Sequence, residues 1–343
     1  MDLQYEKKCL DKIRSSFDLS LFEGKKIYVT GATGLIGKML VKALISNVGD
    51  ICVIAPVRDL ERARSAFAEY DLSKIIFLES DIEHIDIKDM AVDYIVHGAS
   101  VTDSKAFVER PSEVIMTAVN GTKRVLDLAA VNPVKKMLML STMEIYGCPP
   151  DDRKIKEDSE SFLDSMSPRS CYPESKRLCE NLCVSYAKQF SIPVCSLRLT
   201  QTFGPGVRYD DGRVFAEFAR CAIEKRNIIL KTLGKTKRNY LFVGDAVTAI
   251  LTVLTRGEPG LAYNVANEDT YCSIMDMARL VTGIESSIDV EIQPDESNKG
   301  GYAPTLCMNL DTSRLKALGW KADTDLKEMF EILIEDMKSN RQG

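Results

Sequence analysis

The most chemically suggestive pair of residues in the sequence is Tyr172 and Lys176, which lie four positions apart. Pro173 between them favours the first turn of a helix, and apolar residues continue at helical spacing beyond the pair. Residues four apart share one face of a helix, so the phenol and the ammonium should be neighbours. An ammonium lowers the pKa of a nearby phenol, and the N-terminus of a helix adds to that effect. The pair therefore predicts a tyrosine that acts as a base near neutral pH.

Three glycines upstream form a second pattern, which predicts a dinucleotide site. The glycines are Gly31, Gly34 and Gly37. They follow a short apolar stretch at 27–29, and the last of them lies inside a stretch of helical periodicity at 35–44. In such a strand–turn–helix unit, the first glycine permits a tight turn and the second lets the backbone approach a pyrophosphate. The third lets the helix pack closely on the strand. The N–H groups at the start of the helix then bind the negative charge.

The elements that must position these groups alternate along the chain. Further apolar strands, with helices between them, are predicted at 51–57, 75–78, 94–96, 136–140 and 194–199. This alternation predicts an α/β fold with a doubly wound parallel sheet. Ligands bind at the carboxyl ends of the strands in such sheets. Thr142 and Glu144 follow the fifth strand directly and are therefore catalytic candidates.

Other strand ends predict contacts with the cofactor. NAD-binding sheets often place an acidic residue after the second strand to hold the adenosine ribose, but Arg58 and Asp59 stand there. Asp59 could reach the ribose, whereas Arg58 could face the 2′-phosphate of NADP. Asp81 could contact adenine or lie solvated in a loop. The small residues at 98–100 would let the backbone pass close to a cofactor, and His97 before them is expected to be structural.

Composition argues against several other classes of function. The net charge is −5 and no basic cluster stands out, so a nucleic-acid partner is not expected. No apolar run approaches the roughly 18 residues of a membrane span, and the charged N-terminus is unlike a signal peptide, so no membrane partner is expected. The ten cysteines contain no C-x-x-C pair, and there are only two histidines. We therefore expect no metal site, and reduced thiols in a cytoplasmic protein.

Four motifs, in this order, resemble the extended short-chain dehydrogenase/reductases that modify nucleotide sugars: TGATGLIG, HGAS, STMEIYG and the Tyr-x-x-x-Lys pair. The resemblance covers residues 25 to about 335. Three further stretches are more similar to UDP-glucuronate decarboxylases than to galactose epimerases: SPRSCYPESKR, LRLTQTFGPGVRYDDGRV and TKRNYLFVGDAV.

The resemblance implies a Rossmann domain that binds NAD(P) and a smaller α/β substrate domain that closes over it. We expect a helical extension at 1–23, the Rossmann domain at 24–200 and a mainly substrate-binding domain at 201–343. In the resembled family, the helices that correspond to 114–130 and 173–190 pair between two subunits. A homodimer with an isologous interface is therefore expected.

The resemblance also implies a reaction on a nucleotide sugar. Tyr172 takes the proton of the sugar C4 hydroxyl while hydride passes to the cofactor; Thr142 hydrogen-bonds that hydroxyl, and Lys176 holds the tyrosinate and the nicotinamide ribose. The 4-keto sugar has an acidic C5, and a C6 carboxylate on it becomes a β-keto acid that can lose carbon dioxide. Glu144 is then a candidate base or water-positioning residue, and Arg238 a candidate clamp for phosphate or carboxylate. NAD is the expected cofactor because this family usually recycles it, and NADP stays open.

Two sets of contacts follow from these positions. The residues expected to bind the cofactor are Gly31, Thr33, Gly34, Leu35, Ile36, Gly37, Arg58, Asp81, Ile82, Gly98, Ala99, Ser100, Asn120, Tyr172 and Lys176. The residues expected to bind the nucleotide sugar are Ser100, Thr142, Gln201, Arg213, Val214 and Arg238.

The branch of the reaction depends on Met143. In dTDP-glucose dehydratases an Asp at this position expels the C6 hydroxyl, and a thioether cannot donate that proton. Decarboxylation needs no acid there, so Met143 favours it, although the decarboxylases carry Ser here and Gln201 replaces their Asn. A 4,6-dehydratase, a 4-epimerase and an NADPH-dependent 4-keto sugar reductase stay open, and the last would suit Arg58. A non-catalytic protein that senses the cofactor would typically have lost the tyrosine or the lysine.

Overall fold

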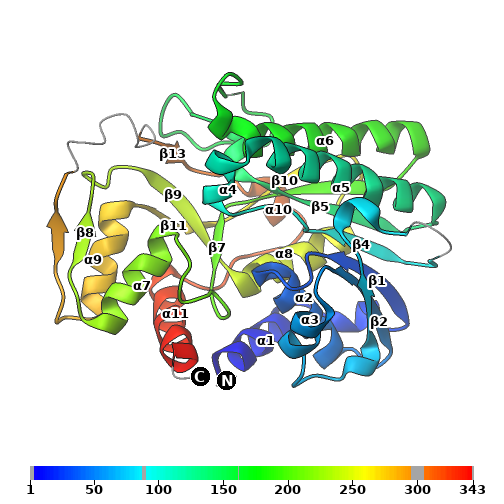
Figure 1. Cartoon of the computed structure of the whole chain (residues 1–343), viewed down its shortest axis with the longest axis horizontal. Coiled ribbons are helices and arrows are strands. Elements are labelled where there is room, and N and C mark those ends of the chain that lie inside the picture. Colours follow the sequence, from blue (N-terminus) through cyan, green and yellow to red (C-terminus); the bar gives the residue numbers. More distant parts are fainter. Residues whose placement is uncertain (1–3, 87–89, 161, 295–304, 342–343) are drawn as a thin grey trace.

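The computed structural model describes residues 4–86, 90–160, 162–294 and 305–341. Its largest element is a seven-stranded sheet with the order β10-β6-β5-β4-β1-β2-β3, in which all neighbouring strands are parallel (Figure 1). The strands are β1 (Lys25–Thr30), β2 (Ile51–Val57), β3 (Ile75–Glu79), β4 (Tyr94–His97), β5 (Lys136–Thr142), β6 (Val194–Leu199) and β10 (Ala262–Val265). The strand order reverses at β1, which is the arrangement of a doubly wound Rossmann sheet. The predicted fold class is confirmed.

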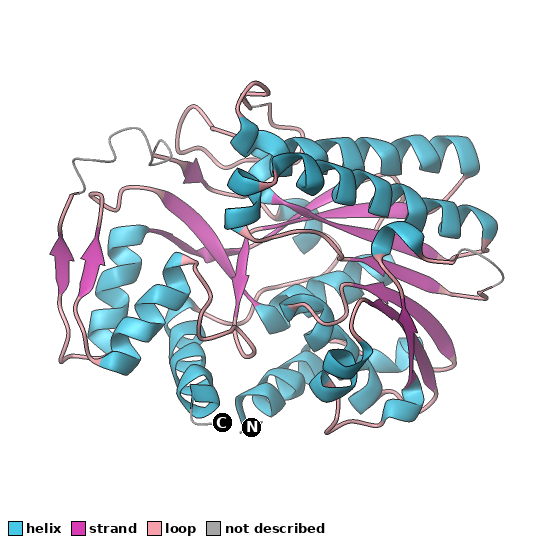
Figure 2. Cartoon of the chain, in the orientation of Figure 1, coloured by secondary structure: helices cyan, strands magenta, loops and turns pink. Residues whose placement is uncertain are grey.

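Helices cover both faces of this sheet, which explains why its strands are almost continuously apolar (Figure 2). Ile27 and Val29 of β1 pack in one core layer, whereas Tyr28 packs in the other, because successive residues of a strand point to opposite faces. The first layer holds α1 (Gln4–Ser16), α2 (Leu35–Asn47), α3 (Leu60–Ala66) and α8 (Val243–Arg256), and the second holds α5 (Pro111–Val131) and α6 (Cys171–Phe190).

A smaller α/β region follows β6 and carries its own sheets. β9 pairs with β11 in an antiparallel manner and with β7 and β13 in parallel, and β8 pairs with β12. Its strands and helices are β7 (Gln201–Phe203), α7 (Val214–Glu224), β8 (Ile228–Leu230), β9 (Lys237–Phe242), β11 (Asn267–Ser273), α9 (Ile274–Ile284), β12 (Val290–Ile292), β13 (Cys307–Met308), α10 (Ser313–Lys316) and α11 (Leu326–Arg341). Since β10 returns to the large sheet, the chain after residue 200 contributes to both regions, and the domain boundaries stay predictions.

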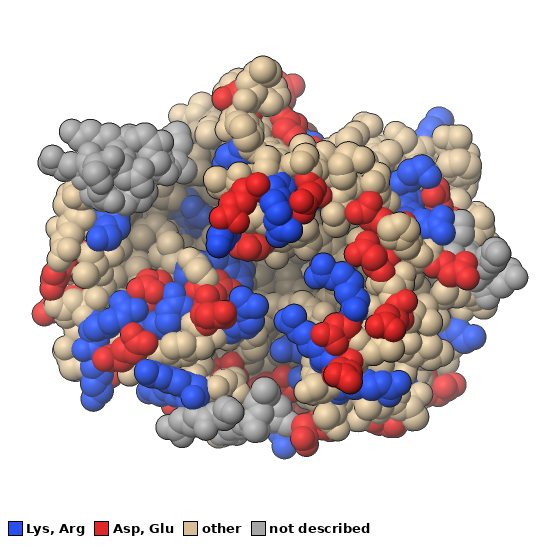
Figure 3. Space-filling view, viewed as in Figure 1, with Lys and Arg blue, Asp and Glu red and all other residues tan. Residues whose placement is uncertain are grey.

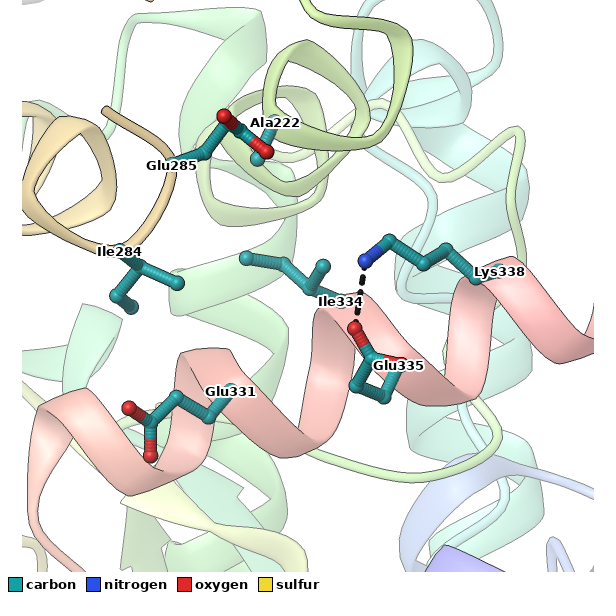
Figure 4. Close-up of a pocket in the computed structure, with 7 residues that line it drawn as sticks. All are labelled: Ala222, Ile284, Glu285, Glu331, Ile334, Glu335 and Lys338. Carbon is teal, nitrogen blue, oxygen red and sulfur yellow. Dashed lines mark hydrogen bonds and ion pairs between the residues drawn. The ribbon is translucent and has the colours of Figure 1, made fainter. Parts of the chain in front are cut away.

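A small cavity of about 170 Å³ lies within this second region, among α7, the end of α9 and α11 (Figure 4). The ammonium of Lys338 and the carboxylate of Glu335, 2.6 Å apart, lie at its edge. None of the residues predicted to be catalytic or to bind cofactor or substrate lines this cavity. The predicted catalytic residues lie instead at and beyond the carboxyl ends of the sheet strands.

The N-terminal helix α1 is tied to the body by a buried ion pair. Its apolar side packs into the core, with Ile13 fully buried. The carboxylate of Glu6 accepts hydrogen bonds from Lys42 Nζ on α2 (2.6 Å) and from the Tyr70 hydroxyl (2.5 Å). The side chains of both ionic partners are less than one tenth exposed. The ammonium of Lys42 is thus buried together with a single carboxylate partner.

Glu6→Ala is expected to destabilise the protein by about 3–5 kcal/mol, because it leaves the Lys42 ammonium buried without its partner. The control Asp11→Ala removes an exposed ion pair with Arg14 (3.0 Å) on the same helix and should cost at most about 1 kcal/mol. Urea unfolding of both variants measures the difference. Equal losses of stability would contradict the assignment of a stabilising role to the buried pair.

Candidate active site

The three glycines form the tight turn between β1 and α2 that their spacing predicts. Gly31 has a φ of +72°, and a Cβ added to it would lie 2.8 Å from the carbonyl carbon of Gly98. A Cβ on Gly37 would lie 2.2 Å from the carbonyl oxygen of Gly31, so helix and strand could not pack as they do. Gly34 is the N-cap of α2, and no side chain makes a capping hydrogen bond to the first N–H groups of this helix. The free N–H groups of this helix start can therefore bind an anion.

The end of β4 is held against the glycine turn by a threonine and a histidine. Thr30 Oγ1 accepts hydrogen bonds from the backbone N–H groups of Gly98 and Ala99, both at 3.1 Å, and lies 2.8 Å from His97 Nδ1. The other ring nitrogen of His97 lies 3.1 Å from Thr122 Oγ1. Burial, with a smaller effect from the charge of Lys176, lowers the pKa of His97 to about 3, so the ring is neutral. His97 is structural, as expected.

A dinucleotide fits this part of the molecule. Beyond the glycine turn and the helix start, the hydroxyl of Ser100 is buried without a hydrogen-bond partner among the described residues. A buried hydroxyl of this kind is costly unless a ligand completes its hydrogen bonding. Thr33, Leu35 and Ile36 lie in the glycine turn and at the first turn of α2, where predicted.

The residues predicted at the adenosine end are mostly engaged with the protein itself. Asp59 caps α3, and its carboxylate accepts from a backbone N–H of that helix at 2.9 Å. Asp81 likewise accepts from the N–H of Glu83 (3.0 Å), and Asn120 Nδ2 donates to the Glu83 carboxylate (2.8 Å). Arg58 is exposed. Ile82, next to Asp81, packs against Gly121, where a Cβ would lie 2.9 Å from the Ile82 side chain.

The candidate base lies where β5 ends and α6 begins. Tyr172 is 8% exposed, and the Thr142 side chain is hydrogen-bonded to its phenol. Lys176 is buried on the first turns of α6; its Nζ donates to the carbonyl oxygen of Leu140 (2.9 Å) and lies 5.9 Å from the Tyr172 ring centroid. The three side chains predicted to act together are thus in one place.

The pKa of the phenol differs from the sequence-based prediction. Burial raises the pKa of Tyr172, and the carboxylate of Glu144 raises it further, while the bond from Thr142 and the charge of Arg169 lower it in part. Burial also lowers the pKa of Lys176. The predicted lowering of the Tyr172 pKa was therefore wrong, because desolvation of the phenol has the largest effect.

Glu144 lies in the same cluster and has a partner that sequence reasoning missed. Its backbone N–H donates to Thr142 Oγ1 (3.2 Å), which fixes the turn after β5. Its carboxylate Oε2 lies 3.3 Å from Nη2 of Arg169. The only sequence signal for Arg169 was its presence in the stretch SPRSCYPESKR, three residues before the tyrosine.

Met143 points into the protein core. It is 5% exposed, and it packs with Ile145, Met308 and Leu310. Its sulfur accepts a hydrogen bond from Thr200 Oγ1 (3.2 Å). The position therefore supplies no acid to the cluster around Tyr172.

Four of the residues predicted to bind the sugar nucleotide come from the second region, whereas Ser100 and Thr142 lie at the ends of β4 and β5. Gln201 begins β7, and Val214 begins α7 and is 42% exposed. Arg213 is paired in a bidentate manner with Asp211 (2.6–2.9 Å), so its guanidinium is already engaged. Arg238 on β9 differs, because its Nε is buried without a partner. The space-filling view shows Lys and Arg side chains around a recess in the middle of this face (Figure 3).

The described part of the chain contains no group of three or more His, Cys, Asp or Glu side chains arranged to hold a metal ion. None of the described helices is both long and apolar enough to cross a membrane. All ten cysteines lie in the described part and are free thiols.

Known proteins resemble this chain in sequence and in fold. UDP-glucuronic acid decarboxylase 2 of Arabidopsis thaliana is 26% identical over 326 residues, which cover 94% of this chain and 70% of the relative. The structure of UDP-glucose 4-epimerase from Thermotoga maritima matches with a TM-score of 0.77 at 23% identity, covering 92% of this chain and 99% of the epimerase. UDP-glucuronic acid 4-epimerase from Bacillus cereus, solved with UDP-glucuronic acid and NAD, matches with a TM-score of 0.77 at 21% identity and the same coverage.

A family model gives the most direct assignment. The model described as "NAD dependent epimerase/dehydratase family" matches residues 27–266, which is well over half of the chain. The match includes the glycine turn, the end of β5 and the start of α6, the segments that carry the resemblance in the sequence. The chain therefore belongs to the NAD-dependent epimerase/dehydratase family.

Proposed function

We propose that the protein decarboxylates UDP-glucuronate, or a closely related nucleotide uronate, through a transient 4-keto intermediate. One observation carries this proposal: Thr142, Tyr172, Lys176 and Glu144 form one cluster, and the residue between Thr142 and Glu144 is a buried methionine without an acidic proton. Chemistry at C4 requires Thr142, Tyr172 and Lys176, and loss of water from C6 would require an acid at position 143, where Met143 stands.

The names of the relatives favour the same branch. The curated relative from Arabidopsis thaliana is a UDP-glucuronic acid decarboxylase, and so is a relative from Xenopus tropicalis at 28% identity over 319 residues. The solved structures of similar fold include 4-epimerases and a dTDP-glucose 4,6-dehydratase. Since these reactions share oxidation at C4, the relatives support nucleotide-sugar chemistry more firmly than any single branch of it.

In the proposed reaction, Tyr172 accepts the proton of the C4 hydroxyl, which Thr142 orients, and Lys176 stabilises the tyrosinate. NAD, held by the glycine turn, the start of α2 and Ser100, would supply the hydride acceptor for C4 and a positive charge that favours the tyrosinate. The resulting β-keto acid loses carbon dioxide from C6, and the electron pair left at C5 takes up a proton. Glu144 lies beside Tyr172 and would position or deliver that proton. Arg238, with its unpartnered Nε, would hold a phosphate or the carboxylate.

The glycine turn, the helix start and Ser100 are proposed to hold NAD. We infer NAD rather than NADP, in agreement with the NAD dependence of the family. An epimerase remains the second candidate, since the cluster at Tyr172 would serve C4 inversion equally well and the two 4-epimerases share the fold.

Product analysis tests the proposed function. Purified protein would be incubated with UDP-glucuronate, UDP-glucose and dTDP-glucose, and the product masses and C4 configurations would be measured. The expected result is loss of carbon dioxide from UDP-glucuronate only, with no net consumption of NAD. Loss of water from a neutral sugar nucleotide, or an unchanged mass with inverted C4, would reject the decarboxylase assignment. No product from any substrate would favour a cofactor-sensing protein.

We also propose a homodimer formed by α5 and α6. Both helices carry exposed apolar side chains on the described surface: Met116 and Val131 on α5, and Leu178, Val184 and Phe190 on α6. Light scattering is expected to give a dimer at micromolar concentration, and Val184→Glu should weaken it by burying a charge in the interface. The control Ile229→Glu, at an exposed apolar site on β8, should stay dimeric. A monomeric wild-type protein would refute the assembly.

A further inference from the structure

The short helix α4 (Ser104–Glu109) places an aromatic ring on the candidate base. Phe107 is buried, and its ring stacks on the Tyr172 ring with centroids 4.6 Å apart and planes at 13°. Next to Tyr172, the thiol of Cys171 donates to the main-chain oxygen of Phe107 (3.5 Å). The ring of the candidate base is therefore fixed from outside its own helix, by a neighbour far away in the sequence.

Arg169 links this stack to Glu144. Its guanidinium carbon lies 4.9 Å from the centroid of the Phe107 ring, and its Nη2 lies 3.3 Å from the Glu144 carboxylate. The side chain of Arg169 is 47% exposed and that of Glu144 is 36% exposed. An ion pair this open to solvent adds little to the stability of the fold, so its effect on the neighbouring groups matters more than its own energy.

We propose that Phe107 and Arg169 are positioning residues for the proton transfer at Tyr172. Phe107 holds the plane of the tyrosine ring so that its hydroxyl stays on Thr142, and Arg169 holds the Glu144 carboxylate and offsets its charge beside the phenol. The inference rests on the proposed function, because it extends the same proton transfer to two residues that do not take the proton themselves.

The electrostatic half of the proposal follows from the charges that face the phenol. These charges are Glu144 from the turn after β5, Arg169 from the turn before α6 and Lys176 on α6 itself. The residue of α4 that contacts the Tyr172 ring is the uncharged Phe107. Glu144 raises the pKa of Tyr172 and Arg169 lowers it. Removing Arg169 leaves the carboxylate uncompensated, so the phenol should ionise at higher pH. Since a base acts in its ionised form, the acid limb of the pH–rate profile should move upward.

The steric half follows from the stack. A smaller side chain at Phe107 leaves space beside the tyrosine ring, which can then tilt away from Thr142. A reacting group misplaced by roughly 1 Å can cost about 10²-fold in rate. Because α4 and not Tyr172 is altered, the loss should fall on kcat rather than on KM.

Kinetic comparison of matched variants tests both halves in the NAD-loaded enzyme. Phe107→Leu should lower kcat by about 10²-fold with little change in KM, and Phe107→Tyr should retain most of the activity. Arg169→Ala should move the acid limb to higher pH, and Arg169→Lys should restore most of the shift. The controls are Phe17→Leu, which removes a buried ring stacked on Phe22, and Arg153→Ala, which removes an exposed ion pair. Effects no larger than those of the controls, or confined to KM, would overturn the proposal.

A second measurement does not depend on turnover. The tyrosinate absorbance of each NAD-loaded protein would be titrated with pH against the same protein carrying Tyr172→Phe, so that the difference reports on Tyr172 alone. Arg169→Ala should raise the pH at which Tyr172 ionises, and adding Glu144→Gln should abolish this shift. If the shift appears in a protein that turns over no nucleotide sugar, the proposed function fails and the positioning role stands. An unchanged titration in Arg169→Ala overturns the inference, whatever the substrate.

Discussion

Tyr172→Phe is expected to fold and bind NAD like the wild-type protein and to lose about 10²–10⁴-fold in turnover. The phenylalanine keeps the aromatic ring, so the stack on Phe107 can persist, but the hydroxyl that is hydrogen-bonded to Thr142 is gone. Without it no group in the cluster is placed to take the C4 proton. Steady-state rates with UDP-glucuronate and a calorimetric NAD titration measure the two expectations separately.

The matched control is Tyr271→Phe, which removes the hydroxyl that donates to Asp152 in the second region of the chain. It should leave turnover unchanged. Wild-type turnover in the Tyr172→Phe variant would contradict the role of Tyr172 as the base. A loss of NAD affinity equal to the loss in rate would give the hydroxyl a role in cofactor binding instead of proton transfer.

Glu144→Gln is expected to oxidise C4 still but to form the decarboxylated product about 10²–10⁴-fold more slowly, because C5 takes up its proton only after carbon dioxide has left. The amide keeps the size of the carboxylate but cannot exchange a proton with C5. Loss of its charge also removes one of the causes that raise the pKa of Tyr172, so the acid limb of C4 oxidation should move to lower pH. Rapid mixing with UDP-glucuronate should therefore show reduced cofactor accumulating before the decarboxylated sugar nucleotide appears.

Glu328→Gln serves as the control for this variant, because it also removes a carboxylate paired with a cation, here Lys12 at 2.7 Å, in contact with α1. It should form the decarboxylated product at the wild-type rate. If Glu144→Gln did the same, the carboxylate would have no part in the protonation of C5.

The sequence predicted those features that depend on local pattern. Six of the seven strands of the large sheet were predictable because parallel strands buried on both faces are continuous apolar runs, as Ile51–Val57 is, whereas the return of β10 to this sheet was not predicted. The glycine turn was predictable because Gly31 and Gly37 occupy positions where no Cβ fits. The start of α6 was predictable from Pro173 and the periodicity after it. These elements alone bring Thr142, Tyr172 and Lys176 together.

What the sequence did not predict depends on contacts between distant segments. Phe107 and Tyr172 are separated by a whole helix and strand, and α4, which brings them together, is too short to leave a periodic signal. The pKa of Tyr172 was mispredicted because burial, which cannot be read from spacing, outweighs a neighbouring charge. Arg213 and Arg238 were both expected to contact the nucleotide sugar, and spacing does not reveal that Arg213 is paired with Asp211 whereas the Arg238 Nε is buried without a partner among the described residues.

The fate of hydrogen at C4 and C5 tests the central claim most directly. UDP-glucuronate deuterated at C4 would be converted by the NAD-loaded protein, and unlabelled UDP-glucuronate would be converted in deuterium oxide. The account predicts that the product keeps the deuterium at C4 in the first experiment and gains one deuterium at C5, in place of the carboxylate, in the second. Deuterium lost from C4 to the solvent or to added NAD, or carbon dioxide released with no solvent hydrogen at C5, would contradict a self-contained 4-keto decarboxylation.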